Sequence, residues 1–329
     1  MQNKIESTYF YFARNTLLIS HFHKIRSLCG DNVQIIPLKG ISLLFSIYKE
    51  DYSRNVGDID LFVPLKNLKM LIDTLTKLGY VFKNQSINNR LQSKRKFDMI
   101  DPDKKYCDLD IHIDLINKKF YRISTGNFSS FALSRLHTIV HNNHTISLLS
   151  PVDEWLYLAQ HYCFHMFSND KWLKDLFLLQ NCLSDKEITD IVIVAKTFHF
   201  ERVVTAVSRH LRHKYPLETV KIPELITKKY FVFDLLFHNP NQKYSYTFSN
   251  RIIAVYWEFI FIDNFQSRLK AYLQLLFPQL NVLSDIYNCS SKMISFVYPF
   301  HSLLVLLSSI LFLPMIMLKN SILTDDIEG

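Results

Sequence analysis

Apolar residues in the first half of the chain follow two different periods. Between residues 8 and 29 they recur every three or four positions, which predicts a long amphipathic helix. Runs with β-branched or alternating apolar residues predict strands at 34–37, 58–63, 80–83 and 106–115. Helical spacing predicts two further helices, at 41–48 and 64–78. The polar stretch 84–105 is expected to be a hairpin or a mobile loop. The pattern therefore predicts a sheet flanked by helices.

The pattern changes after residue 150. Ser150 can cap a helix and Pro151 suits a first helical turn. The acidic residues Asp153 and Glu154 then suit the positive end of that helix. From here the spacing is mainly helical, apart from a polar interruption at 239–249. We therefore expect two domains, one with the sheet at residues 1–148 and a mostly helical one at 149–329.

Composition narrows the class of protein. A hydrophobic content of 48% with 21% charged residues indicates a globular chain and excludes disordered and fibrous classes. Six glycines against 26 phenylalanines and 17 tyrosines favour long helices over turn-rich β architecture. The five cysteines form no CxxC pair, which excludes a zinc knuckle and favours a reducing, cytoplasmic compartment. The N-terminal segment lacks the basic start and continuous apolar run of a secretory signal. The net charge of +8 would suit an anionic nucleotide, although the lysines are spread along the chain.

One segment near the C-terminus is strongly apolar. Residues 302–318 contain no charged residue and are followed by Lys319. A helix that crosses a bilayer needs about 20 apolar residues, and Pro314 interrupts this run. The favoured interpretation is a buried or membrane-surface helix, and a spanning helix is the alternative. A cytoplasmic protein that contacts the inner face of the membrane is compatible with this segment.

The clearest candidate chemistry lies in the expected strand at 58–63. Alternate residues of a strand point to the same face, so the carboxylates of Asp58 and Asp60 should project together. Two adjacent carboxylates repel each other unless a cation lies between them, and oxygen ligands favour Mg²⁺ or Mn²⁺. The alternative is a solvated acidic face on an edge strand. The favoured interpretation is a metal site that binds phosphate through the metal.

A second acidic strand is expected at 106–115. The two-residue period places Asp108, Asp110, His112 and Asp114 on one face. A third carboxylate beside a metal site can ligate metal and act as a general base. We assign this role to Asp110, with Asp108 and His112 as secondary candidates. The alternative is again a solvated sheet face.

Basic and glycine residues before these strands are candidates for phosphate binding. Lys39 and Gly40 join a strand to a helix, where glycine allows close approach and the helix N-terminus favours anions. Lys39 could neutralise a triphosphate, and Ser42 is an auxiliary candidate. Arg54 could act like Lys39, although an arginine in a loop is more often a solvated surface charge.

These residues also carry a resemblance to a known family. The chain has LKG at 38–40, RNVGDIDLFV at 54–63 and LGY at 78–80. This order resembles the uncharacterised nucleotidyltransferase family of the polymerase-β-like superfamily, over residues 10–180. The family also has an acidic residue two before a histidine, like Asp110 and His112, and a later segment similar to WLKDL at 172–176. In this segment Asp175 could approach the nucleotide or cap a neighbouring helix.

The resemblance implies an α+β fold, with a mixed nucleotidyltransferase-type sheet flanked by helices and a helical C-terminal domain. It implies metal ligands at Asp58, Asp60 and Asp110, and nucleotide contacts at Lys39, Gly40, Ser42, Arg54 and Gly57. The expected activity moves a nucleoside monophosphate from a nucleoside triphosphate to an acceptor and releases pyrophosphate, with Mg²⁺ or Mn²⁺.

The acceptor is not identified by the sequence. A small molecule or a protein is favoured over RNA, because the chain shows no stripe of arginine and aromatic residues. The main alternative is a nucleotide-binding or degenerate accessory protein of the same fold that has no turnover.

Overall fold

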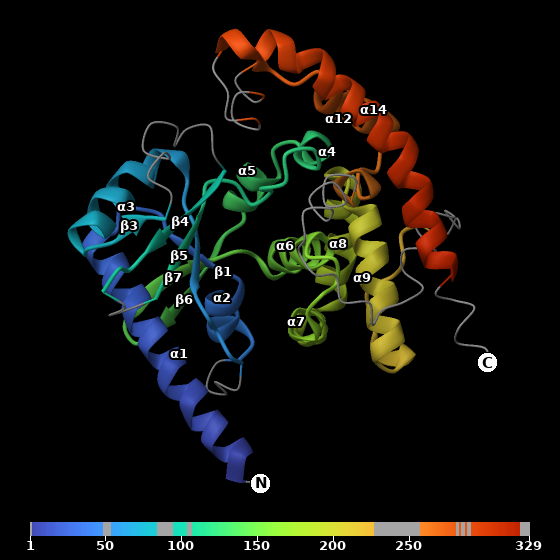
Figure 1. Cartoon of the computed structure of the whole chain (residues 1–329). Helices are drawn as coiled ribbons and strands as arrows, with labels where there is room; N and C mark the ends of the chain where they lie inside the picture. The colour runs from blue at the N-terminus through green and yellow to red at the C-terminus, as the bar shows by residue number, and fades with distance from the viewer. Residues whose placement is uncertain are drawn as a thin grey trace. The chain divides into compact units, whose positions relative to one another are not determined.

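The computed structural model describes residues 2–48, 54–83, 95–103, 107–226, 257–280, 283, 287 and 291–322 (Figure 1). The chain packs as two units. Unit 1 contains Met1–Asn117, Asn127–Leu158 and Lys174–Ile191, and unit 2 contains Lys118–Gly126, Ala159–Leu173 and Val192–Gly329. Each unit is therefore assembled from segments that alternate along the chain. The two-domain division at residue 148 stays a prediction.

The centre of unit 1 is a five-stranded mixed sheet. Its strands are β1 (Ile36–Leu38), β2 (Ile59–Phe62), β3 (Val81–Phe82), β4 (Lys96–Ile100) and β5 (Leu109–His112), in the order β1-β2-β5-β4-β3. Strands β2 and β5 are parallel, and the other neighbours are antiparallel. The described part of the polar stretch at 84–105 contains β4, which pairs with β3 as a hairpin. The expected mixed sheet is confirmed.

Helices cover this sheet because their apolar residues share one face. The long helix α1 (Gln2–Cys29) buries Phe22 and Ile25 completely. Helix α3 (Leu65–Lys77) buries Leu68, Leu71 and Leu75 at helical spacing and lies beside α1 (Figure 1). Two shorter helices complete the set, α2 (Lys39–Ser46) and α5 (Phe128–Leu133).

A two-stranded hairpin of β6 (His137–His141) and β7 (His144–Leu148) also belongs to unit 1. This hairpin was not among the elements expected from the sequence pattern. Its turn residues Asn142 and Asn143 both have positive φ, at 49° and 63°. Asparagine tolerates this left-handed conformation, which two-residue hairpin turns require. The pair of asparagines between alternating runs was the signal available in the sequence.

Three helices follow the hairpin and contribute residues to both units: α6 (Pro151–Phe164), α7 (Asp170–Cys182) and α8 (Asp185–Thr197). The predicted start of α6 is confirmed. The backbone N–H of Asp153 donates to the Ser150 hydroxyl at 3.2 Å, which satisfies one of the free donors in the first turn.

The described part of unit 2 contains helices and no strand. Besides the shared helices, it includes α4 (Arg122–Thr125), α9 (Glu201–Lys214), the 3-10 turn η3 (Leu217–Thr219), α12 (Phe265–Leu276) and α14 (Ser291–Ile322). Helix α9 buries Val203, Val207 and Leu211 on one face. The α+β class and the helical character of the second half are therefore confirmed. The polar interruption expected at 239–249 lies outside the described residues.

The apolar segment 302–318 lies within α14, which runs for 32 residues. Among the described residues, none of the helices has the length and apolar character required to cross a membrane.

Candidate functional site

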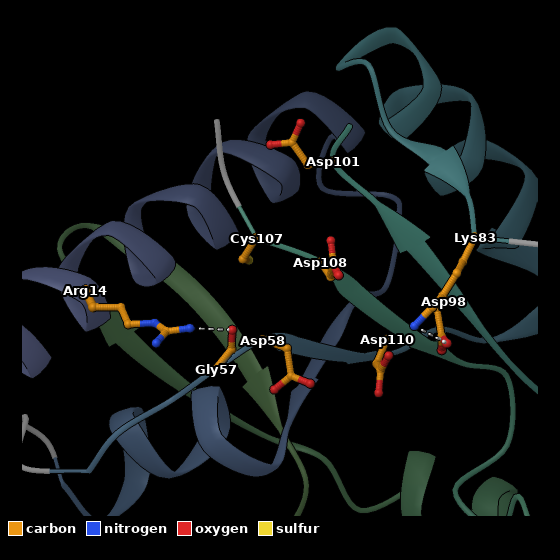
Figure 2. A pocket seen from close by; sticks show the side chains of 9 residues that line it. All are labelled: Arg14, Gly57, Asp58, Lys83, Asp98, Asp101, Cys107, Asp108 and Asp110. Atoms are coloured by element: carbon orange, nitrogen blue, oxygen red, sulfur yellow. Dashed lines mark hydrogen bonds and ion pairs between the residues drawn. The ribbon is translucent and has the colours of Figure 1, made fainter. Parts of the chain in front are cut away.

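The sheet of unit 1 places carboxylates from three neighbouring strands side by side. Asp60 on β2 pairs in register with Asp110 on β5, and Asp110 pairs in register with Asp98 on β4. Asp58 and Asp108 precede the paired residues Ile59 and Leu109 on the two parallel strands. Figure 2 shows the side chains of Asp58 and Asp110 pointing to the same side of the sheet. Strand pairing thus brings together the two acidic runs.

A cavity of about 660 Å³ opens at these carboxylates (Figure 2). Its lining residues are Arg14, Gly57, Asp58, Lys83, Asp98, Asp101, Cys107, Asp108 and Asp110. Aspartates outnumber the two basic residues, so the cavity is suited to cations or to an anion that arrives with a cation. Asp58, Gly57, Asp108 and Asp110 are the sequence-predicted residues that line it.

Asp60 lies next to this cavity and is compensated by two neighbours. The Nζ atom of Lys39 lies 2.6 Å from Oδ1 of Asp60, and Nε2 of His112 lies 3.1 Å from the same oxygen. Burial opposes ionisation of Asp60, but Lys39 and His112 together bring its pKa below the ordinary value. Burial lowers the pKa of His112. A neutral His112 can donate from Nε2 to the Asp60 carboxylate.

Asp58 has the opposite balance. Desolvation of its carboxyl group, followed by the charges of Asp60 and Asp110, raises the pKa of Asp58 to about 6, although the residue is still exposed to solvent. Lys39 and Lys96 oppose this rise. The repulsion among these carboxylates is the interaction that a bound cation would relieve.

Asp110 is paired with Lys96 of β4. Burial disfavours the charged form of Lys96, but the hydrogen bond and the charge of Asp110 raise its pKa above the ordinary value. This lysine was not among the expected site residues, because it lies in the polar stretch before β5. The alternation in KFDMI at 96–100 was the available signal, since it places Lys96 and Asp98 on one strand face.

The ligand atoms of Asp60, Asp110 and His112 all lie within 4.8 Å of one another. No other cluster of metal-ligating side chains was found in the part of the chain that the structure describes. The predicted ligand set was Asp58, Asp60 and Asp110, so the structure brings together two of its members and adds His112. Carboxylates suit Mg²⁺ and Mn²⁺, and the uncompensated charge at Asp58 lies on the same sheet. These residues therefore fit a divalent cation.

A later segment of the chain packs closely against the Lys39–Gly40 turn. Lys39 has a φ of 51°, a left-handed conformation that non-glycine residues seldom adopt. A Cβ atom on Gly40 would lie 2.5 Å from Nη1 of Arg54 and 2.8 Å from Cγ1 of Val56. Glycine is required at this position because the chain itself approaches it, and the turn directs Lys39 toward Asp60.

Arg54 is buried in a network behind this turn. Its Nη2 donates to Oδ2 of Asp175 at 2.7 Å, and its Nε lies 3.0 Å from both Asp175 oxygens. The Tyr48 hydroxyl donates to Asp175 at 2.8 Å. Arg54 is thus an internal ion-pair partner and not a solvated surface charge. Neither Arg54 nor Asp175 lines the cavity, so a nucleotide contact for either stays a prediction.

Ser42 lies buried on α2 beside Glu154 of α6. Burial raises the pKa of Glu154 to about 7, and the neighbouring hydroxyl groups of Ser42 and Ser46 oppose the rise. Ser42 also does not line the cavity. Its auxiliary nucleotide role likewise stays a prediction.

Several residues at the cavity wall were not predicted from the sequence. Lys83, Asp98 and Asp101 come from the β3–β4 region, and Cys107 precedes β5. Arg14 comes from α1, where its Nη2 donates to the carbonyl of Gly57 at 2.9 Å. No local pattern marks Arg14, because its position depends on how α1 packs.

Three comparisons with known proteins bear on this site. No curated protein matched the sequence. The structure is similar to one titled "Solution Structure of Antibiotic-Resistance Factor ANT(2'')-Ia Reveals Substrate-Regulated Conformation Dynamics", with 14% sequence identity and a TM-score of 0.41. That match covers 61% of this chain and 100% of the other.

The third comparison is with protein families. The model of a family described as "Uncharacterised nucleotidyltransferase" matches residues 2–215. The match contains the whole sheet, both acidic strands and the Lys39–Gly40 turn. It covers well over half of the chain, so this protein belongs to the uncharacterised nucleotidyltransferase family.

Proposed function

We propose that this protein transfers a nucleoside monophosphate from a nucleoside triphosphate to an acceptor and releases pyrophosphate. The observation that carries this proposal is the meeting of Asp58 and Asp110 at one cavity, with Asp60 paired in register with Asp110 on the adjacent parallel strands. Family membership supports the same class of reaction.

Asp58, Asp60 and Asp110 would hold Mg²⁺ or Mn²⁺, with His112 beside them. When bound, the cation supplies positive charge that offsets the phosphate oxygens and the crowded carboxylates. Gly57 would lie along the nucleotide, since it lines the cavity directly before Asp58. Asp108 lines the same wall and is a weaker candidate for the metal.

Asp110 is the proposed general base. It lines the cavity, and a carboxylate at this position could accept a proton from the acceptor. The acceptor oxygen or nitrogen forms a bond to the α-phosphorus while the bond from that phosphorus to the bridging oxygen breaks. The acceptor proton passes to Asp110, and the bridging oxygen leaves with pyrophosphate. Lys39 is proposed to offset charge on the phosphates, aided by Arg14 and Lys83 at the cavity wall.

Arg54 and Asp175 are proposed to position Lys39. The guanidinium of Arg54 packs against Gly40. The Asp175 carboxylate holds that guanidinium by accepting hydrogen bonds from its Nε and Nη2 atoms. Ser42 would act through the same buried region. Their effect on the nucleotide is therefore proposed to be indirect.

A small molecule or a protein side chain is the proposed acceptor. The excess of aspartates in the cavity would repel the phosphate backbone of RNA. A cytoplasmic location is part of the proposal, because nucleoside triphosphates are the substrate and the four cysteines in the described residues are free thiols. Contact with the inner face of the membrane through the C-terminal apolar segment 302–318 is also part of the proposal.

The test is to incubate the purified chain with Mg²⁺ or Mn²⁺ and each α-³²P-labelled nucleoside triphosphate, with and without cell extract. Asp58→Asn and Asp60→Asn variants should lose on the order of 100-fold or more of the labelled product, because even residues that orient metal ligands are worth about 10- to 100-fold. Asp31→Asn is the matched control, since Asp31 is a fully exposed aspartate in a loop. It should retain wild-type activity.

Thermal melting of each variant separates lost chemistry from lost folding. Labelled product that is equal in wild type and both site variants would refute the assignment of the aspartates. Metal-dependent triphosphate binding in calorimetry without any labelled product would favour the accessory protein that has no turnover.

A further inference from the structure

Helices α12 and α14 of unit 2 are packed against each other along one seam. The His301 ring of α14 donates from Nε2 to the carbonyl of Leu275 at 2.9 Å, and the Ser302 hydroxyl donates to the carbonyl of Leu276 at 2.9 Å. The hydroxyls of Tyr272 and Ser309 lie 3.0 Å apart further along the pair. Several polar contacts therefore fix which faces of the two helices point inward, and Figure 1 shows the helices side by side.

The outward faces of this pair are apolar. On α12 and directly after it, exposed side chains recur every four residues at Phe265, Leu269, Leu273 and Phe277. On α14, the exposed apolar side chains are Met293, Phe296, Phe300, Leu303, Leu304, Leu306 and Leu307. Phe296 and Phe300 are 77% and 65% exposed. We call this set the α12–α14 surface. Soluble monomers seldom expose so many large apolar side chains on adjacent helices, so the surface requires a partner.

The charges on the two helices indicate the chemistry of that partner. Neither α12 nor α14 contains an aspartate or a glutamate. Their sequences include the basic residues Arg268, Lys270, Lys292 and Lys319. Lys270 is exposed, next to Leu269 of the apolar stripe. Two helices that have no acidic residue and carry an exposed lysine beside an apolar stripe complement a bilayer with anionic headgroups.

Other features of the surface also fit a bilayer better than a protein. The apolar stripe on α12 repeats along a whole helix, and the exposed apolar side chains of α14 run from Met293 to Leu307. Protein interfaces usually surround a compact apolar centre with hydrogen-bonding groups. An extended, uncharged face with large aromatic residues is typical of helices that lie in the plane of a membrane surface.

We propose that the α12–α14 surface binds an anionic lipid bilayer by lying in the boundary between its headgroups and acyl chains. The phenylalanines and leucines insert, and Lys270 remains at the level of the phosphate groups. This inference does not depend on the proposed nucleotidyl transfer, because it uses only residues of unit 2.

The test is flotation of the full chain with phosphatidylcholine vesicles, with or without phosphatidylglycerol. The wild type should float with vesicles that contain phosphatidylglycerol. A Phe296→Asp/Phe300→Asp variant should show a bound fraction about tenfold lower, because two charges would enter the apolar layer. The matched control is Val140→Asp/Ile193→Asp, which places the same two charges at other exposed apolar positions and should bind like the wild type.

A second variant, Phe296→Trp, keeps the surface apolar and reports its environment. Its tryptophan emission should shift to shorter wavelength when phosphatidylglycerol vesicles are added. Equal flotation of the Phe296→Asp/Phe300→Asp variant and the wild type would overturn the proposal, as would equal binding to neutral vesicles. A concentration-dependent dimer in light scattering, lost in the same variant and without vesicle binding, would instead assign the surface to a second copy of the chain.

Discussion

Single residues of the candidate site differ in how their charges are compensated. Asp60 has Lys39 and His112 within hydrogen-bonding distance, and Asp110 has Lys96. The pKa of Asp58 is raised to about 6, because its carboxyl group is partly desolvated and faces the other two carboxylates. Asp58 is therefore the carboxylate whose ionised form a bound cation would stabilise most.

Glu154, which is 2% exposed, also has a shifted pKa. Its pKa is raised from 4.5 to about 7 by burial. Between these values the folded state holds a proton on Glu154 that the unfolded state has released. The free energy of unfolding therefore falls as the pH rises through this range, by up to about 3 kcal/mol.

Replacing this residue should remove that dependence. The glutamine in Glu154→Gln does not titrate, so position 154 should contribute no pH dependence to the free energy of unfolding between pH 4.5 and pH 7. The variant should therefore become more stable relative to the wild type as the pH rises. Urea unfolding at several pH values measures the difference. A constant difference between the two proteins from pH 4.5 to pH 8 would show that Glu154 does not titrate as described.

Among the elements, the turn into α2 depends on close approach by another segment. A methyl group on Gly40 would displace Arg54 or Val56, and Arg54 is held by Asp175. Gly40→Ala should therefore lower the free energy of unfolding by about 1–3 kcal/mol, as overpacking typically does. Gly57→Ala is the control, because its Cβ would meet no atom closer than 4.0 Å.

Chemical denaturation of both glycine variants is the measurement. A Gly40→Ala protein as stable as Gly57→Ala would mean that the guanidinium can move away from the turn without cost. The expected loss of stability in Gly40→Ala would show that the LKG run at 38–40 packs against Arg54, the first residue of the run at 54–63.

The elements themselves were largely predictable from local pattern. The strands at β1, β2, β3 and β5 and the helices α1, α2, α3 and α6 follow from apolar spacing, because side-chain direction repeats every 2 or 3.6 residues. The β6–β7 hairpin was missed because its turn depends on two left-handed asparagines. Helix α14 continues through Pro299, which local rules would place at a helix end.

At the scale of the whole molecule, unit 1 takes residues from beyond the predicted boundary at 148. Asp175 of α7 pairs with Arg54, and the ring of Tyr157 on α6 lies edge-on to His112 with centroids 6.3 Å apart. A fragment of residues 1–148 lacks both partners. It would leave the buried charge of Arg54 without its counter-ion, which typically costs about 3–5 kcal/mol.

We therefore expect the fragment 1–148 to show no cooperative unfolding transition. The fragment 1–191 contains all segments of unit 1 and should unfold cooperatively. Near-ultraviolet circular dichroism during urea titration distinguishes the two outcomes. A cooperative transition in fragment 1–148 would establish the predicted boundary and contradict the packing of α6 and α7 into unit 1.

Local patterns in the sequence were enough to predict the α+β class, the family and the two acidic runs, because strand period and motif spacing are local properties. The strand period placed Asp58 beside Asp60, and Asp108 beside Asp110, whereas the meeting of the two pairs was implied only by the family resemblance. The parallel pairing of β2 with β5 became known only from the folded chain. The folded chain alone also revealed the compensation of Asp110 by Lys96 and the burial of Arg54 against Asp175. These interactions join residues far apart in the chain, and their energies depend on burial, which no local pattern encodes.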